Sequence, residues 1–323
     1  MRSLTKRKKF KGKVGLALGS GAARGWAHIG VLKALSEKNI EISYVAGTSI
    51  GALVGAVFAS GKLLSLEDVI MKLDWKQIAY FFDIKIPRSG LIDGNKITNF
   101  IRKYVKGMMI EDLPIPFCAV TTDIQTGNEV VIKNGDILEA VRASISVPGI
   151  FTPVKKDGMI LVDGGLVNPV PISVVRNMGA EYIISVDLNH NMVNKSTLKK
   201  IKLLEDKNSL SEQEIDSNIK KNNGVFAMLN KKIAETELPG WDHLKKCMNK
   251  DPLPSIFEIL TNSINIMSTQ ITGTRLKIDS PDILIQPELG HFKFLDFNKG
   301  KEAIECGYEA TKKTIDRITR ELG

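Results

Sequence analysis

The chain has 323 residues, of which 43% are hydrophobic and 25% are charged. This composition can bury a full core and excludes a disordered or collagen-like protein. The formal net charge is +9, but seven basic residues and no acid lie between positions 2 and 13, so the rest of the chain is nearly neutral. This distribution argues against nucleic-acid binding, and no nucleic acid is expected as a partner.

The cysteine pattern and the apolar runs bear on the compartment. The three cysteines are scattered and lack CxxC spacing, so we predict neither a disulfide framework nor a zinc site. No apolar run reaches the ~18 residues of a membrane span, and no clean apolar signal core follows the basic N-terminus. We therefore expect a cytoplasmic protein. Residues 1–12 are predicted to be a disordered basic tail, either a solvated end or a peripheral contact with anionic membranes.

Two strand–turn–helix units follow the tail. Residues 14–18 are typical of a strand, residues 19–25 form a glycine-rich turn, and a helical pattern comes next. The unit recurs with a strand at 44–46, a turn at 47–51 and an apolar helix at 52–59. Two such units in tandem predict parallel strands.

Strands and helices alternate along the rest of the chain. Further strands are predicted at 116–121, 129–132, 159–162, 182–186 and 283–285, and helices near 95–105, 136–144, 171–178, 255–272 and 300–320. This alternation predicts a three-layer α/β/α sandwich with a central, mostly parallel sheet. Residues 191–253 are rich in Lys, Asn, Glu and Ser. We expect them to be a charged, partly helical insertion in one α/β domain, formed by residues 13–190 and completed by residues 254–323.

A candidate nucleophile lies in the second turn, which matches G-x-S-x-G around Ser49. A nucleophile elbow needs a strand before it, a helix after it and glycines two residues either side of the serine, because the tight turn leaves no room for side chains. Ser49 meets all three conditions with Gly47 and Gly51. The hydroxyl would emerge at the C-terminal edge of the sheet, beside a helix N-terminus that favours negative charge. The alternative is a tight turn with an idle serine.

The first turn suggests a dinucleotide site, but its spacing contradicts one. The glycines run G-x-G-x-x-x-G, and Arg24 stands where the third glycine of G-x-G-x-x-G belongs. The small residues offer backbone N–H groups that can converge on one anion, as an oxyanion hole requires. We therefore favour an oxyanion hole over a nucleotide site.

A base for Ser49 must come from a histidine or an acid. The chain has four histidines, none with a clear strand-end context: His28, His190, His243 and His291. Asp163 is better placed, because it follows the apolar strand at 159–162 and opens an Asp-Gly-Gly turn. The residues alone leave open a Ser-His-Asp triad that uses His190 or His291.

Four ordered blocks resemble the patatin-like phospholipases. They are the glycine turn with its Arg-Gly, the G-x-S-x-G elbow, the run at 143–153 that contains Ser-Ile-Ser-Val-Pro-Gly, and the Asp-Gly-Gly. The resemblance covers residues 14 to about 190 and continues more weakly through 283–287 and the final helix. The chain looks most like the compact bacterial cytosolic branch of the family.

The resemblance implies a serine acyl-ester hydrolase that acts on lipid or lysolipid esters without a metal or cofactor. Ser49 would be the nucleophile and Asp163 the base, with no histidine. The oxyanion donors would be the backbone amides of Gly21 and Ala22, with Ala23 as a third candidate.

Arg24 would orient the glycine loop or meet a lipid headgroup. The chain departs from the family in one respect: family members often carry three successive glycines where this chain has Ser20-Gly21-Ala22. Alanine still donates its N–H, so the oxyanion hole is retained. The alternative to an enzyme is a lipid-binding or regulatory protein with a weak or idle hydrolase site.

Two sets of apolar residues have both a functional and a purely structural interpretation. An aromatic cluster could line an acyl-chain groove or pack in the core: Trp75, Tyr80, Phe81 and Phe82, near Ile84 and Ile86. Four residues at helical spacing could form a lid, a membrane-facing stripe, a dimer contact or an ordinary packed helix face: Val225, Met228, Leu229 and Ile233.

Deleting residues 2–12 tests the membrane interpretation of the tail. The deletion removes six of the seven basic residues and none of the candidate site residues. At ~1 kcal/mol per basic residue near an anionic surface, we expect the truncated protein to lose binding to anionic vesicles while it still hydrolyses short soluble esters. Co-sedimentation measures this, and the full-length protein should bind less at 1 M salt than at 0.1 M, since the Debye length falls from ~10 Å to ~3 Å. Equal binding by both proteins would show that the tail is only a solvated end of the chain.

Overall fold

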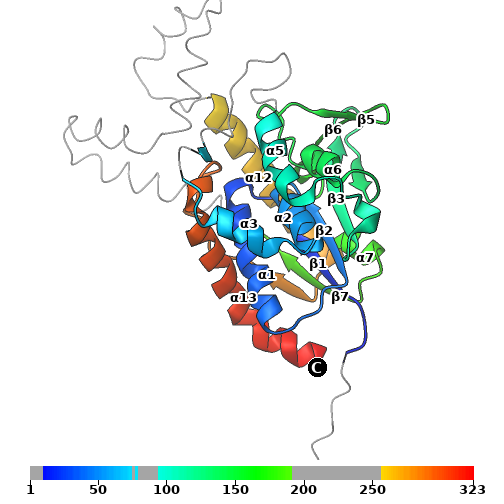
Figure 1. Ribbon diagram of the computed structural model, residues 1–323, viewed down its shortest axis with the longest axis vertical. Coiled ribbons are helices and arrows are strands. Elements are labelled where there is room, and N and C mark those ends of the chain that lie inside the picture. Colours follow the sequence, from blue (N-terminus) through cyan, green and yellow to red (C-terminus); the bar gives the residue numbers. More distant parts are fainter. Residues whose placement is uncertain (1–9, 75–76, 79–93, 191–255) are drawn as a thin grey trace, which may run out of the picture. The chain divides into compact units, whose positions relative to one another are not determined.

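The computed structural model describes residues 10–74, 77–78, 94–190 and 256–323 (Figure 1). The chain divides into two compact units, Met1–His190 with Met267–Gly323, and Asn191–Ile266. All the strands described here belong to the first unit. The predicted aromatic cluster at 75–86, the apolar stripe at 225–233 and tail residues 1–9 lie outside the described residues.

An eight-stranded sheet forms the centre of the first unit, in the order β5-β6-β3-β2-β1-β7-β8, with β4 paired to β3 off this path. The strands are β1 (Val14–Leu18), β2 (Tyr44–Thr48), β3 (Phe117–Asp123), β4 (Glu129–Ile132), β5 (Val154–Lys156), β6 (Met159–Asp163), β7 (Tyr182–Val186) and β8 (Ile283–Ile285). Strands β3, β2, β1, β7 and β8 are parallel, whereas β4, β5 and β6 join through antiparallel pairs. The central strands β1, β3 and β7 are buried along their whole length, as a parallel sheet covered on both faces requires.

The helices complete the layers. They are α1 (Ala27–Glu37), α2 (Ile50–Ala59), α3 (Leu63–Ile70), α5 (Asn95–Val105), α6 (Ile137–Ser144), α7 (Ile172–Asn177), α12 (Ile256–Asp279) and α13 (Gly300–Leu322), with short 3-10 turns η1 (Ala22–Trp26), η2 (Ile110–Asp112), η3 (Gly164–Leu166) and η4 (Phe297–Lys299). Alternate residues of β1 face opposite layers, because strand side chains point to opposite sides. Leu16 joins a buried cluster with Ile29 and Ile304, while Ala17 joins one with Val174. The predicted three-layer α/β/α fold is confirmed.

Helix α3 and strand β5 were not predicted from the sequence. Both are short, and β5 consists of one valine followed by two lysines, which gives no apolar run. Within the described residues, no helix has the length and apolar character needed to cross a membrane.

The C-terminal helix packs directly on the first helix of the chain (Figure 1). A Cβ on Gly30 of α1 would lie 1.9 Å from the Ile304 carbonyl oxygen, and one on Gly307 of α13 would lie 2.0 Å from the Ala27 carbonyl oxygen. Glycine on both helices therefore lets the two backbones touch. Helix α13 also contacts η1, so the turn that follows β1 packs against elements from both ends of the sequence.

Gly30→Ala tests this close contact. We expect the free energy of unfolding to fall by about 1–3 kcal/mol, because the new methyl group overlaps the backbone of α13. The matched control is Gly273→Ala in α12, where a Cβ meets nothing within 4 Å. There the loss of glycine from a helix interior should stabilise the protein by about 0.5–1 kcal/mol. Urea unfolding measures the stability of both variants, provided that the m-value does not change. A Gly30→Ala protein as stable as the Gly273→Ala control would contradict the contact.

Candidate active site

Strand pairing brings the two predicted site residues to the same place. In the β2–β3 pair, Thr48 lies opposite Val120, so the next residue, Ser49, continues toward the level of Thr121. On the other side of β3, Asp163 lies opposite Thr121. This register brings the last residue of β6 level with the end of β2. Ser49 Oγ donates a hydrogen bond to Asp163 Oδ2 across the end of β3.

The backbone at Ser49 is held in an unusual conformation. Its φ is 58° and its ψ is −125°, which non-glycine residues rarely adopt. A Cβ on Gly47 would lie 2.4 Å from the Gly51 carbonyl oxygen, and a Cβ on Gly51 would lie 2.2 Å from the Leu18 carbonyl oxygen. Both glycines are therefore required by backbone contacts, and those contacts hold the turn at Ser49. The result is the geometry expected of a nucleophile elbow.

Ser144 supports the elbow from α6. The Ser49 N–H donates to Ser144 Oγ at 2.9 Å, and the Ser144 hydroxyl donates to the Val120 carbonyl at 2.6 Å. Ser144 is fully buried, so both of its hydrogen bonds are protected from water. Ser144 belongs to the run at 143–153, but no role was predicted for it from the sequence. Its position is set by the packing of α6 on β3, which no local pattern shows.

Asp163 is buried at the end of β6 and is fixed by several hydrogen bonds. Its N–H donates to the Ser146 carbonyl at 2.9 Å, and its own carbonyl accepts from Thr122 Oγ1 at 3.0 Å. Its Oδ1 accepts from the Gly165 N–H at 2.7 Å. Burial raises the pKa of Asp163 to about 6, against the opposing effect of the hydrogen bonds from Ser49 and Gly165. The carboxylate is thus a stronger base than a free aspartate but is ionised at neutral pH.

Two histidines that the structure describes, His28 and His291, are engaged elsewhere. His28 is fully buried in α1, and its Nε2 donates to the Gly19 carbonyl at 2.8 Å. Burial lowers the pKa of His28 to about 4, so the ring is neutral at pH 7. His291 is exposed, and its Nε2 lies 2.7 Å from Glu302 Oε1 of α13. The partner of the Ser49 hydroxyl is an aspartate.

The glycine turn after β1 lies against the elbow. A Cβ on Gly25 would lie 2.1 Å from Ile50 Cγ1, so the turn and the residue after Ser49 are in close contact. Among the described residues, the N–H groups of Gly21 and Ala22 have no hydrogen-bond acceptor. Ala22 has a φ of 49°, a left-handed conformation that glycine adopts more easily. The two free amides are those predicted first as oxyanion donors.

The third predicted donor, Ala23, does not fit the prediction. Its N–H donates to the Phe294 carbonyl at 3.2 Å. Phe294 comes from the segment that precedes η4, far along the chain, so the sequence around the turn could not reveal this acceptor. The Ala23 amide is committed to holding the turn.

Arg24 lies in the interior and fits only one of its two predicted roles. Its side chain is 1% exposed, and its Nε donates to the Gly21 carbonyl at 3.0 Å. Burial lowers the pKa of Arg24 to about 10, while Asp187 opposes this shift, so the guanidinium remains charged at neutral pH. Such a buried side chain cannot contact a lipid headgroup. Orientation of the glycine loop stays the prediction for Arg24, and the hydrogen bond to Gly21 is consistent with it.

An apolar pocket opens at Ser49. Its walls are almost entirely hydrophobic and include Trp26, Leu53, Phe100, Val147, Phe151 and Phe294. Ser49 and Ala22 both line it, so the elbow and the glycine turn face the same cavity. An acyl group held there would place its carbonyl beside the Ser49 hydroxyl.

Comparison with known proteins agrees with this geometry. Residues 16–176 match the family model described as Patatin-like phospholipase. An uncharacterized NTE family protein of Mycobacterium tuberculosis strain H37Rv is 41% identical over 177 residues, which cover 55% of this chain and 49% of that protein. The chain belongs to the patatin-like phospholipase family, and this membership supports a lipid hydrolase.

Two animal relatives extend the comparison. Patatin-like phospholipase domain-containing protein 6 of Mus musculus is 28% identical over 314 residues, which cover 95% of this chain and 21% of that protein. Neuropathy target esterase sws of Drosophila melanogaster is 39% identical over 183 residues, which cover 54% of this chain and 13% of that protein. The chain thus spans about half the length of the mycobacterial relative and a smaller share of the animal proteins.

The raised pKa of Asp163 predicts a stability difference for Asp163→Asn. An acid whose pKa is higher in the folded state favours folding below its ordinary value of 3.8, and this contribution is lost as the pH rises through about 6. The amide does not ionise, so the variant should be more stable than the wild type by about 1–3 kcal/mol at pH 8. Urea unfolding at pH 8 and pH 4 measures the gain. An equal gain at both pH values would contradict the ionisation argument.

Proposed function

We propose that this protein is a serine acyl-ester hydrolase that acts on acyl esters of lipids or lysolipids, with Ser49 as nucleophile and Asp163 as base. The observation that carries the proposal is the direct hydrogen bond between Ser49 Oγ and Asp163 Oδ2 beside an apolar pocket. The family match and the relative named as an esterase support the same class of reaction.

In the acylation step, Asp163 takes the Ser49 hydroxyl proton as Oγ attacks the ester carbonyl carbon. The negative charge that forms on the carbonyl oxygen is stabilised by the N–H groups of Gly21 and Ala22. When the tetrahedral species collapses, the ester C–O bond breaks and the leaving alcohol takes the proton from Asp163. The acyl group is then bound to Ser49.

In the deacylation step, Asp163 takes a proton from a water molecule that attacks the acyl carbon. Collapse of the second tetrahedral species breaks the bond to Ser49 Oγ, which regains the proton from Asp163. The products are a free carboxylic acid and the original enzyme. A pKa of about 6 suits both steps, because the group accepts a proton at neutral pH and also returns it.

The pocket favours a long acyl chain as the part of the substrate that is buried. Among the described residues that line the pocket, Ser49 is the only one with a hydroxyl group, and none carries a charge. Each buried methylene contributes about 0.8 kcal/mol of transfer free energy. A polar headgroup would therefore remain outside this pocket, while the acyl chain selects the substrate.

Replacement of the dyad tests the proposed function. Ser49→Ala should abolish ester hydrolysis and covalent labelling by a fluorophosphonate probe, because the attacking oxygen is lost. Asp163→Asn should reduce kcat by at least ~10²-fold through loss of the general base. Turnover of a chromogenic ester and of a panel of lipid esters measures both.

Two histidine variants serve as controls. His190→Ala and His291→Ala should keep activity within about tenfold of the wild type. A folded histidine variant without activity would favour the Ser-His-Asp triad instead. A wild-type protein that binds lipid but neither turns over esters nor reacts with the probe would favour the lipid-binding alternative.

A further inference from the structure

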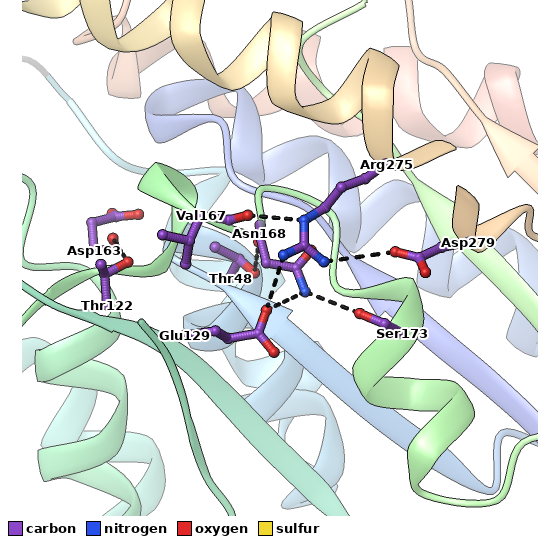
Figure 2. Close-up of polar contacts among 9 residues, drawn as sticks. All are labelled: Thr48, Thr122, Glu129, Asp163, Val167, Asn168, Ser173, Arg275 and Asp279. Atoms are coloured by element: carbon purple, nitrogen blue, oxygen red, sulfur yellow. Dashed lines mark hydrogen bonds and ion pairs between the residues drawn. The ribbon is translucent and has the colours of Figure 1, made fainter. Parts of the chain in front are cut away.

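A polar cluster lies to one side of Asp163, around the segment that follows the end of β6 (Figure 2). Asn168 is fully buried, and its Nδ2 donates to Glu129 Oε2 of β4 at 2.6 Å and to Ser173 Oγ of α7 at 3.3 Å. Arg275 of α12 donates from Nε to the Val167 carbonyl at 2.9 Å. Arg275 Nη2 also lies 3.8 Å from Glu129 Oε2. Side chains from β4, α7 and α12 thus hydrogen-bond to two consecutive residues, Val167 and Asn168.

Val167 and Asn168 are hydrogen-bonded directly to the turn that holds the Asp163 carboxylate. The N–H groups of Val167 and Asn168 both donate to the Gly164 carbonyl, at 3.1 and 2.9 Å. Gly165, which follows Gly164, donates its N–H to Asp163 Oδ1 at 2.7 Å. Gly164–Leu166 is a single 3-10 turn whose N-cap is Asp163 itself. A displacement of residues 167–168 would therefore move the amide that orients the carboxylate.

The same loop is also tied to the nucleophile. Thr48 Oγ1 donates to the Asn168 carbonyl at 2.8 Å, and Thr48 immediately precedes Ser49 (Figure 2). Thr48 and Asn168 are both fully buried. Asn168 therefore connects the end of β2, which carries Ser49, to the turn that carries Asp163.

From these contacts we propose that Glu129, Asn168 and Arg275 form a clamp of positioning residues that holds the Asp163 carboxylate in hydrogen-bonding register with Ser49. The proposal rests on the proposed function. None of the three side chains lines the apolar pocket or contacts the dyad itself. Their action passes through the backbone of residues 164–168.

The clamp makes a specific prediction about acid–base behaviour. The Gly165 N–H bond lowers the pKa of Asp163, so a loosened turn should raise that pKa further. Loss of either clamp charge should therefore shift the acid limb of the pH profile upward. A direct electrostatic effect would instead act in opposite directions, because Arg275 is positive and Glu129 is negative. The remaining charge in the cluster, Asp279, lies 3.7 Å from Arg275 Nη1 and is unchanged in both variants.

The experiment compares Arg275→Met and Glu129→Leu, which remove the clamp hydrogen bonds as well as the charges, with the matched control Arg176→Met. Arg176 also binds the end of α12, through the carbonyls of Asp279 and Ser280 at 2.6 and 3.0 Å. We expect both clamp variants to lose kcat by about ten- to hundredfold, the range for a misplaced reacting group. Their KM should stay within about twofold, because the pocket is formed by other residues.

In both clamp variants the acid limb should move to higher pH, and Arg275→Lys should recover most of the lost kcat. Arg176→Met should behave like the wild type. The proposal is overturned by kcat within twofold of the wild type in both clamp variants, by acid limbs that move in opposite directions, or by an equal loss in Arg176→Met.

A direct titration separates this proposal from the proposed function. The pKa of the Asp163 carboxyl can be followed by ¹³C NMR in protein labelled at aspartate, with Asp163→Asn to assign the signal. This measurement needs no turnover. Equal ester hydrolysis by the wild type and Ser49→Ala would overturn the proposed function, whereas an Asp163 pKa that is unchanged in both clamp variants would overturn the clamp.

Discussion

The site depends on a contact between bare backbone segments: the first turn of α2 rests on the carbonyl groups that end β1. Only a residue without a Cβ fits at Gly51, where a methyl carbon would lie 2.2 Å from the Leu18 oxygen. This contact keeps the ends of the neighbouring parallel strands β1 and β2 close together and holds Ser49 in its strained conformation. It also explains why the glycine turn and the elbow open into one pocket, since Gly25 packs on Ile50 just beyond the serine.

Burial has two opposing effects at Asp163. Removing the carboxylate from water makes it a better base, but the same desolvation disfavours the ionised form that a base needs. The protein offsets part of this penalty with hydrogen bonds from Ser49 and from the Gly165 N–H, so the carboxylate remains ionised at neutral pH. Basicity and orientation are therefore linked through one short turn, and the residues that shape this turn influence both.

Local patterns carried most of what could be predicted. Ser49 lies in a glycine-flanked turn after a strand, and Asp163 ends a strand and opens a glycine turn; such turns have sequence signatures that do not depend on the rest of the fold. Tertiary partners were not visible in the same way. The acceptor for the Ala23 amide is Phe294, and the side chains around Asn168 come from β4 and α12, which lie far apart in the sequence. The burial of Arg24 likewise depends on how α1 and the glycine turn pack, so its headgroup contact was a wrong expectation.

The pairing of α1 with α13 has a consequence for biosynthesis. Residues 16–176 carry the family match, yet the sheet around β1 is completed by β7 and β8, and α1 is covered by a helix that begins at Gly300. At roughly 5–20 residues per second, a ribosome takes tens of seconds to proceed from α1 to α13. Throughout that time the side of α1 that α13 covers in the folded protein has no partner, and the nascent chain must be kept from aggregating until α13 has been synthesised.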